Sequence, residues 1–236
     1  MIYITGDTHG QHDFAKIRTF AYECNIASKD DYLIIAGDFG AIWNEKTLKQ
    51  DLKPYEDLPF TVLFIDGNHE NFDLLNSFPI EMWNDGKIHR IRNNIIHLMR
   101  GQVYEIEGKK IFTMGGATSV DRAYRTEYIS WWKDEFITYS NMQIAYDNLK
   151  KVKNKVDYII THSCDERALY YPPLVGRLFQ TEKYPENTML SYFEENVEYK
   201  HWYFGHYHLD GDLNNKKTVL YNEIIRLGDG IKNGRL

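Results

Sequence analysis

The sequence predicts an α/β protein built around a central β-sheet. Short runs of β-branched and aromatic residues alternate with segments whose apolar residues recur at helical spacing. The strand-like runs of the N-terminal half are apolar throughout, as expected for strands buried on both faces. With 43% hydrophobic residues and a formal net charge of -6 over 236 residues, the composition fits one large core. We therefore expect a single domain over residues 1–236.

The N-terminal half alternates strands with helices. Apolar, β-branched runs predict buried strands at residues 2–5, 32–36 and 61–65. Between them, helical spacing predicts one helix over residues 14–24 and a shorter one, disturbed by a proline, over residues 48–55.

In the middle of the chain the pattern changes to consecutive strands. Strand-like runs at residues 95–99, 102–106 and 110–114 are separated by turn residues, and we expect them to pair antiparallel as one meander. Further along, Ser140 and Gln143 predict a capping box at the start of the next helix.

The C-terminal part returns to an alternation of strands and helices. It adds predicted strands at residues 158–161, 201–204 and 218–227 and a helix around residues 190–197. No internal repeat, low-complexity tract or linker interrupts the chain, so we expect no domain boundary.

The composition argues against several classes of protein. No apolar run approaches the roughly 18 to 20 residues of a membrane-spanning helix. No segment resembles a signal or transit peptide either, so we expect a cytoplasmic protein without membrane contact. The two cysteines are too far apart for a disulfide framework or a thiolate metal site. The net negative charge argues against a protein whose whole surface binds a nucleic-acid backbone. We therefore consider nucleic acid only as a substrate.

Polar side chains follow the predicted strands at the points where these end. They are Asp7, His9, Asp38, Asn68, His69, His162, His206 and His208. Any one of them alone reads as an ordinary turn residue. Ligands of open α/β sheets bind at the carboxyl ends of the strands, so we expect the whole set to converge on one crevice. Oxygen and nitrogen donors without cysteine suit a hydrolytic metal centre, in which one carboxylate can bridge two ions about 3.5 to 4 Å apart.

Glycine precedes four of these residues, namely Asp7, Asp38, Asn68 and His206. A glycine suits a sharp turn in which the backbone approaches a bound ligand closely. The glycines therefore support the prediction of a site at the strand ends.

The residues stand in an order that resembles the calcineurin-like metallophosphoesterases. The order is Asp-x-His, Gly-Asp, Gly-Asn-His-Glu, His and Gly-His-x-His, and it spans residues 6–208. Among that family, the chain resembles uncharacterised bacterial and phage-type members. The resemblance implies a four-layer α/β/β/α sandwich, with two mixed β-sheets flanked by helices and two metal ions at the sheet edge. It implies Asp38 as a ligand shared by both ions. The further ligands that it implies are Asp7, His9 and His208 for the first ion, and Asn68, His162 and His206 for the second.

The resemblance also implies a binuclear metal-dependent phosphoesterase. A hydroxide bridging the two ions would attack a phosphomonoester or a phosphodiester. His69, which matches the family's catalytic histidine, would act as general acid or stabilise the transition state. Two dications against two carboxylates leave an excess of about two positive charges, which favours an anionic substrate. Imidazole ligands favour Mn, Fe, Zn or Ni over Mg or Ca, and we expect Mn.

The substrate class is open among small molecules, nucleotides and phosphoproteins, and we expect no obligatory protein partner. The competing hypothesis is a non-catalytic scaffold or protein-binding module, since some proteins that resemble this fold have lost ligands. Here every ligand position is filled and His69 is present, which favours an enzyme.

The chain departs from the Ser/Thr protein phosphatases, although its motifs around Asp7 and His69 are similar to theirs. After Asp38 it lacks the Asp that orients the catalytic histidine in those enzymes and the Arg that holds phosphate. A protein-phosphatase assignment is therefore not favoured, and Asp73 becomes the candidate to orient His69. His12, close in sequence to the first ligand turn, is a candidate to support that turn.

Substrate contacts are expected in the segment of residues 117–134. Arg122 and Arg125 are its candidate phosphate-binding residues, and Trp131 and Trp132 offer faces on which a base could stack. The alternative is a solvated loop whose aromatic residues pack in a small satellite core.

Overall fold

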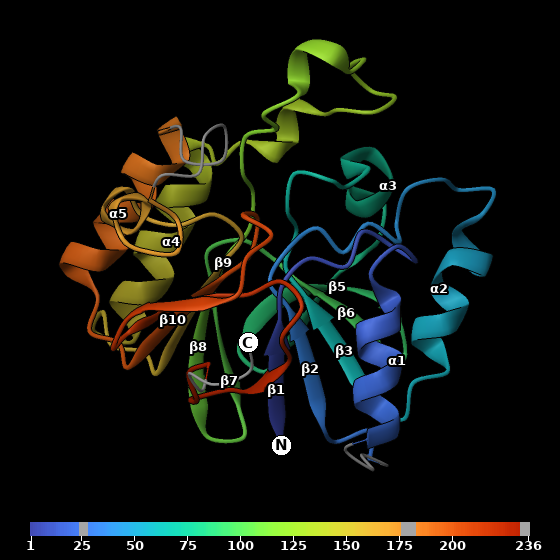
Figure 1. Ribbon diagram of the computed structural model, residues 1–236, viewed down its shortest axis with the longest axis horizontal. Coiled ribbons are helices and arrows are strands. Elements are labelled where there is room, and N and C mark those ends of the chain that lie inside the picture. The colour runs from blue at the N-terminus through green and yellow to red at the C-terminus, as the bar shows by residue number, and fades with distance from the viewer. Residues whose placement is uncertain (24–27, 176–182, 232–236) are drawn as a thin grey trace.

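Two β-sheets lie face to face between two layers of helices in the computed structural model (Figure 1). One sheet is covered by α1 (Phe14–Glu23) and α2 (Leu48–Glu56), and the other by α4 (Tyr139–Lys151) and α5 (Pro185–Asn196). The predicted four-layer α/β/β/α sandwich of two mixed sheets is therefore confirmed. The structure describes residues 1–23, 28–175 and 183–231.

The first sheet carries the alternation of strands and helices seen in the N-terminal half of the sequence. Over the described residues its order is β13 (Ile225–Arg226), β1 (Ile2–Thr5), β2 (Tyr32–Ile35), β3 (Thr61–Phe64), β6 (Ile95–Leu98), β5 (Gly86–Arg92) and β4 (Ile80–Trp83). Strands β1, β2, β3 and β6 run parallel, while β13, β5 and β4 pair antiparallel with their neighbours. The short helix α3 (Phe72–Asn76) follows β3.

The second sheet is formed by later strands. In the described part of the chain its order is β11 (Gly211–Asn214), β12 (Lys217–Val219), β10 (His201–Phe204), β9 (Tyr158–Thr161), β8 (Lys109–Met114) and β7 (Gln102–Ile106). The central strands run parallel and both edge strands pair antiparallel. The 3-10 helices are η1 (Arg122–Tyr124) and η2 (Lys133–Glu135) after β8, and η3 (Glu166–Tyr170) after β9.

One hydrophobic core fills the space between the sheets, and two further cores lie under the helices. In β2, Ile34 faces the other sheet, while Leu33 and Ile35 pack in the core beneath α1 and α2. In β9, Ile160 joins the inner core and Ile159 joins the core beneath α4 and α5. Side chains of a strand alternate between its two faces, so this double burial explains why the predicted strands are apolar throughout.

The predicted antiparallel meander over residues 95–114 is wrong in its first strand. β6 lies in the first sheet, parallel to β3, while β7 and β8 form the expected antiparallel pair in the second sheet. The predicted strand at residues 218–227 is likewise two strands, β12 and β13, which lie in different sheets. Both sheets bury strands on both faces, so an apolar run does not indicate which of the two sheets it joins.

Two helices begin earlier than the sequence predicted. The capping box of α4 is Thr138 with Asn141, rather than Ser140 with Gln143. Thr138 Oγ1 accepts a hydrogen bond from the Asn141 backbone N–H at 3.2 Å, and Asn141 Oδ1 accepts one from the Thr138 backbone N–H at 3.0 Å. α5 begins at Pro185, because proline is well suited to the first helical position, where no backbone N–H is needed.

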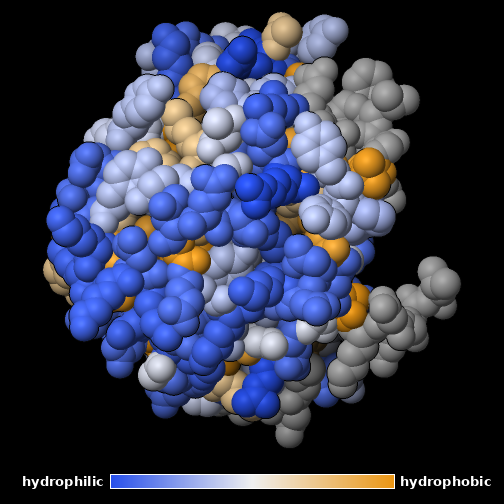
Figure 2. Space-filling view, turned by 90° about the vertical axis from the view of Figure 1, so that its left-hand side faces the viewer, coloured by the Kyte–Doolittle hydropathy of each residue, from blue (hydrophilic) through white to orange (hydrophobic). Residues whose placement is uncertain are grey.

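The outer face over α4 and α5 is mostly hydrophilic, with small and separate hydrophobic areas (Figure 2). None of the helices in the described ranges has both the length and the apolar character that crossing a bilayer requires.

A buried ion pair in the second sheet gives a test of the fold. Lys217 is 3% exposed, and its Nζ lies 2.6 Å from Asp165 Oδ1 and 2.9 Å from Glu194 Oε2. Lys217→Met leaves the buried Asp165 carboxylate unpaired, so we expect the free energy of unfolding, measured with urea, to fall by about 3 to 5 kcal/mol. In the control Lys155→Met, which removes an exposed pair with Glu198, it should change by less than about 1 kcal/mol. Equal effects of both substitutions would contradict a stabilising role for this buried pair.

Candidate active site

The residues singled out in the sequence meet at one edge of the sandwich, where the parallel strands of both sheets end (upper edge in Figure 1). Asp7 and His9 follow β1, Asp38 follows β2, Asn68 and His69 follow β3, His162 follows β9, and His206 and His208 follow β10. The first sheet thus contributes the carboxylates, and the second sheet contributes three of the histidines. The expected convergence on one edge is observed.

Asp38 lies at the centre of this group. Its Oδ2 is 3.5 Å from His9 Nε2, and its Oδ1 is 3.3 Å from His162 Nε2. Oδ1 also accepts hydrogen bonds from the backbone N–H groups of Asn68 and His69, each at 2.7 Å. Burial raises the pKa of Asp38, but the neighbouring His162 and His69 outweigh burial and hold it well below the ordinary value. The carboxylate is therefore ionised although it is only 1% exposed.

Asp7 is the second buried carboxylate, and one of its oxygens lacks a hydrogen bond. Oδ1 accepts from the His206 backbone N–H at 2.9 Å. Oδ2 has no hydrogen-bond partner, although His208 Nε2 lies 3.2 Å from it without hydrogen-bond geometry. An unsatisfied oxygen on a fully buried carboxylate is costly unless a cation compensates it. The residues present therefore fit a metal ion at this position.

Two histidines turn one ring nitrogen toward the centre because the other nitrogen is bound elsewhere. His162 Nδ1 lies 2.8 Å from the Ala36 carbonyl oxygen, and His9 Nδ1 lies 2.8 Å from Asp13 Oδ2. Such outer partners fix the ring orientation of metal-binding histidines. Burial lowers the pKa of both rings, but Asp38 outweighs it and raises them to about 10 for His162 and about 9 for His9. The negative field that retains these protons also favours bound cations.

Three overlapping sets of side chains in the described residues have ligand atoms within 4.8 Å of one another. The sets are Asp7, His9 and His208; Asp7, Asp38 and His162; and His9, Asp38 and His69. The first set holds three residues predicted as ligands of the first ion, and the second set combines Asp7 and the shared Asp38 with His162, a predicted ligand of the second ion. The third set includes His69, so proximity alone does not separate this histidine from the ligands.

His206 and Asn68 complete the group on the side of the second sheet. The His206 ring lies 5.0 Å from the His162 ring, centroid to centroid. Burial, followed by the nearby His162, lowers the pKa of His206 to about 3, so this imidazole is neutral. Asn68 Oδ1 lies 3.1 Å from His162 Nε2.

The glycines at the strand ends are required by neighbouring side chains of the site. A Cβ at Gly37 would lie 2.0 Å from His162 Nδ1, and a Cβ at Gly67 would lie 2.0 Å from Asp38 Oδ1. The sequence predicted a close approach to a bound ligand, and the observed approach is to the candidate ligand residues themselves. Any larger residue at these positions would displace a side chain of the site.

Four residues of the group adopt left-handed backbone conformations. The φ angles are 43° at His9, 47° at Asp38, 69° at His206 and 50° at His208. Each costs on the order of 1 kcal/mol or more for a residue with a Cβ, and such strain clusters at functional sites. The turn after β1 is stabilised by the turn after β2, because the His9 backbone N–H donates to the Asp38 carbonyl oxygen at 2.9 Å.

The segment after β8 folds over the site and brings Arg125 to His69. Arg125 Nη1 lies 3.0 Å from His69 Nδ1. The same guanidinium donates to both carboxylate oxygens of Asp121, at 2.6 and 2.8 Å, and to the Ser130 carbonyl oxygen at 3.1 Å. Arg125 Nη2 also lies 3.5 Å from His69 Nε2. An arginine only donates, so the shorter contact makes Nδ1 the acceptor and leaves the proton of the neutral ring on Nε2. Burial lowers the pKa of His69, and Arg125 adds to this effect.

Asp73 does not orient His69, contrary to the prediction. Its Oδ2 accepts a hydrogen bond from Trp132 Nε1 at 2.8 Å. Trp132 is 2% exposed and packs edge-on against Trp43, with ring centroids 5.4 Å apart. The expectation that Trp132 offers a stacking face is therefore wrong, and the alternative of an aromatic satellite core holds for it.

Arg122 remains available for other contacts. Its guanidinium lies 5.6 Å from the Trp131 ring centroid and 5.3 Å from that of Phe136, and it forms no hydrogen bond with another described residue. Arg122, Arg125 and Ser119 line a cavity of about 360 Å³.

Ser119 connects this segment to Asn68. Asn68 Nδ2 donates to Ser119 Oγ at 3.2 Å, and Ser119 Oγ donates to Glu135 Oε2 at 2.7 Å. Glu135 is fully buried, and its Oε1 accepts from the Ser119 backbone N–H at 2.9 Å. These bonds fix the Asn68 amide with its nitrogen toward Ser119 and its oxygen toward His162.

Sequence reasoning missed the supporting carboxylates. Asp13, which binds His9, was detectable only through its i+4 spacing. The side chain of the neighbouring His12 is exposed, and His12 contacts the turn only through its backbone N–H, which donates to the His9 carbonyl oxygen at 3.3 Å. Glu70 stands in the Gly-Asn-His-Glu motif, is fully buried and accepts from the Phe39 backbone N–H at 2.8 Å. Glu135 gave no signal, because it lies in a segment without periodic pattern.

Comparison with known proteins identifies the family. The model of the calcineurin-like phosphoesterase family matches residues 1–210. No curated protein matches the chain significantly. A structure of a protein of unknown function from Aquifex aeolicus is 15% identical with a TM-score of 0.37, covering 84% of this chain and 87% of that one. A structure of phosphopantetheinyl hydrolase from Mycobacterium tuberculosis is 16% identical with a TM-score of 0.42, covering 93% and 87%. Since these TM-scores are low, the assignment rests on the family match: the chain belongs to the calcineurin-like phosphoesterase family and is a metal-dependent phosphoesterase.

Proposed function

We propose that the protein hydrolyses a phosphoester with two divalent metal ions bound at the strand ends. In this proposal both ions share Asp38. The remaining ligands are Asp7, His9 and His208 for one ion, and Asn68, His162 and His206 for the other. Mn is the metal that we propose first, with Fe, Zn and Ni as alternatives, because imidazole nitrogens dominate the donor set.

The position of Asp38 is the observation that carries this proposal. Its two oxygens face different histidines, with Oδ2 3.5 Å from His9 Nε2 and Oδ1 3.3 Å from His162 Nε2. A carboxylate placed between two sets of nitrogen donors is suited to bridging two ions. Asp7, with its unpaired buried oxygen, supplies a second negative charge beside it.

When bound, the ions would lower the pKa of a coordinated water and polarise the phosphoryl group. His69 would then contribute at the leaving oxygen. Arg125 engages His69 Nδ1, so Nε2 carries the proton and can donate a hydrogen bond or the proton itself to that oxygen. Arg125 thereby takes the orienting role for which the sequence suggested Asp73.

Arg122 is the phosphate-binding residue that we propose. Its guanidinium is free of hydrogen bonds to the described residues and lines the 360 Å³ cavity beside Ser119. Arg125 lines the same cavity, but its Nε, Nη1 and Nη2 all have partners, so we propose that it acts on the substrate chiefly through His69. A cavity of this size suits a small phosphoester or a nucleotide.

A substrate panel in the presence of Mn tests the proposed function. The panel would contain phosphomonoesters, phosphodiesters, dinucleoside polyphosphates, phosphopeptides and single-stranded nucleic acid. We expect turnover of at least one small phosphoester. No turnover across the panel by protein with two bound ions would favour the non-catalytic scaffold.

The two-ion site predicts the effect of Asp38→Asn on metal content. Protein saturated with Mn and then desalted should hold two ions per chain by elemental analysis. Asp38→Asn should weaken the binding of both ions together, because it removes a shared ligand and a negative charge between them. Asp57→Asn is the matched control, since the Asp57 carboxylate is 61% exposed. A single ion in the unaltered protein would contradict the binuclear proposal.

His69→Asn separates a catalytic role from a ligand role. We expect turnover to fall by about 10² to 10⁴-fold while the metal content stays that of the unaltered protein. His12→Asn, at an exposed position three residues beyond His9, should change neither quantity. Loss of an ion in His69→Asn would instead indicate that His69 is a metal ligand, which its closeness to His9 and Asp38 allows.

Ser119→Ala tests whether the segment after β8 positions Asn68. Removal of Ser119 Oγ frees the Asn68 amide, and loss of such an outer partner typically lowers metal affinity by about 10 to 100-fold. Mn titration would measure the affinity of the weaker ion. Thr118→Val is the matched control, because Thr118 Oγ1 also binds a buried carboxylate, Glu186, at 2.9 Å, but does not contact Asn68. Equal losses in both variants would indicate a general effect on the segment.

A further inference from the structure

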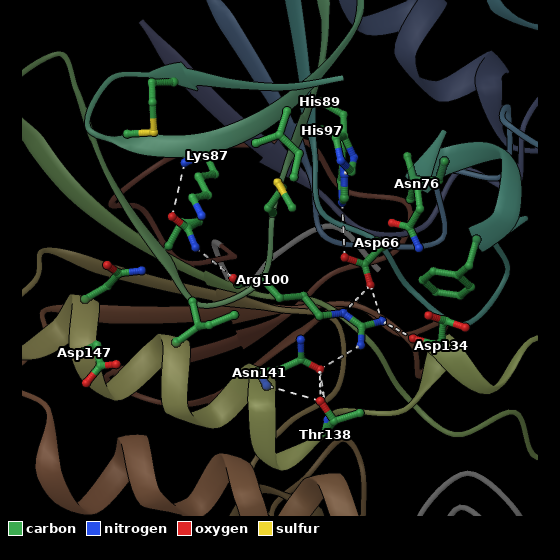
Figure 3. A pocket seen from close by; sticks show the side chains of 18 of the residues that line it. Asp66, Asn76, Lys87, His89, His97, Arg100, Asp134, Thr138, Asn141 and Asp147 are labelled. Carbon is green, nitrogen blue, oxygen red and sulfur yellow. Dashed lines mark hydrogen bonds and ion pairs between the residues drawn. The ribbon is translucent and has the colours of Figure 1, made fainter. Parts of the chain in front are cut away.

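A larger cavity lies apart from the metal site, between β5, β7 and α4. Its volume is about 640 Å³, within the range of about 300 to 1,000 Å³ that is usual for small-molecule sites. Figure 3 shows its polar side, where Asp66, His97 and His89 are grouped above α4. We call it the relay cavity, after the hydrogen-bonded chain formed by these three residues.

The relay consists of two direct contacts between buried side chains. His97 Nε2 lies 3.2 Å from Asp66 Oδ1, and His97 Nδ1 lies 3.1 Å from His89 Nδ1. His97 is 4% exposed, and Asp66 and His89 are each 2% exposed. Asp66 Oδ2 accepts from Arg100 Nε at 2.7 Å, so the carboxylate has a cationic partner.

The direction of these hydrogen bonds follows from the charges. The Asp66 carboxylate is paired with the Arg100 guanidinium, which only donates, so the carboxylate accepts. His97 Nε2 therefore donates to Asp66. Asp66 and Arg100 already neutralise each other, and a further charge on His97 would be buried without compensation. A neutral His97 accepts at Nδ1, so His89 Nδ1 donates to it.

His89 consequently presents a lone pair at Nε2. Burial, and next to it His97, lowers the pKa of His89 to about 4, which agrees with a neutral ring. His89 Nε2 has no hydrogen-bond partner in the described part of the chain. It also keeps some accessible surface, unlike the fully buried unpaired atoms there. The His89 ring lines the cavity.

The cavity is lined partly by charged and amide side chains and partly by apolar side chains. The apolar side chains include Phe72, Met82 and Ile144, of which Met82 is 66% and Ile144 40% exposed. A metal ion does not fit this arrangement, because His89 belongs to none of the close groups of potential ligands among the described residues. A neutral buried acceptor close to apolar side chains instead suits an organic molecule that carries apolar surface.

We propose that the relay cavity binds a small, largely apolar molecule that carries one N–H or O–H donor, with His89 Nε2 accepting the hydrogen bond. The relay sets this preference, because the Asp66 carboxylate fixes the tautomer of His97 and, through it, that of His89. An aromatic ring with a single N–H group has the required chemistry. The site is independent of the proposed phosphoester chemistry.

Indole and N-methylindole are matched probes for this proposal, since they share an apolar body but only indole has an N–H donor. Titration of the full-length protein, followed by ligand-observed NMR, would give both affinities. We expect indole to bind about three- to tenfold more tightly, the effect of one net hydrogen bond. In His89→Phe, which keeps an aromatic ring but removes the lone pair, the two affinities should become equal.

Two further variants locate the binding. Ile144→Arg, at a half-exposed position of α4, places a charged side chain in the cavity without disturbing the core, and it should abolish binding of both probes. His201→Phe alters a histidine outside the cavity and should preserve the preference for indole. Equal affinities of indole and N-methylindole for the unaltered protein would overturn the proposal. So would unchanged binding in Ile144→Arg or the absence of binding to the unaltered protein.

Discussion

Two buried carboxylates determine the construction of this protein. Asp7 and Asp38 follow adjacent strands of one sheet, they are 0% and 1% exposed, and neither carboxylate forms an ion pair with a lysine or arginine among the described residues. Histidines surround them instead. Desolvated anions of this kind are strongly unfavourable unless they are compensated, and here backbone N–H groups and histidines face them at a place that suits metal ions. The required glycines and the left-handed turns at the strand ends are consequences of crowding these side chains at one edge.

A second set of buried carboxylates holds the covering segment, which is the segment after β8 that folds over the site. Glu135 accepts two bonds from Ser119, and Glu186 accepts two from Thr118. Arg100, in the turn that crosses between the sheets, pairs with Asp66 and also donates to the Asp134 and Phe136 carbonyl oxygens at 2.7 Å each. The turn that sequence reasoning misread as part of a meander therefore joins the turn after β3, which holds the candidate ligand Asn68, to the covering segment.

The sequence predicted the fold class and the converging residues, because both depend on local pattern. Strand identity follows from apolar runs, and strand ends are marked by glycine followed by a polar residue. Sheet membership did not follow, since residues 95–98 are equally compatible with either buried sheet. The partner of His69 was also missed, because Arg125 is 56 residues away and reaches it only through the fold of an irregular segment. Asp73 was nearer in sequence, but it faces Trp132.

The covering segment divides into anchored ends and an exposed tip. At the ends, Thr118, Ser119 and Glu135 are buried and hydrogen-bonded. At the tip, Tyr124 is 93% exposed and Ile129 is 69% exposed. Among the anchored residues, Ser119 contacts Asn68 directly, so a change at Ser119 displaces a candidate ligand along with the segment. The tip touches the site through Arg125 and His69, while its apolar side chains have little packing of their own. Substrate preference can therefore change at the tip without disturbing the carboxylates at the strand ends. Ser119 and its partner Glu135 leave no such freedom, because together they also fix the Asn68 amide.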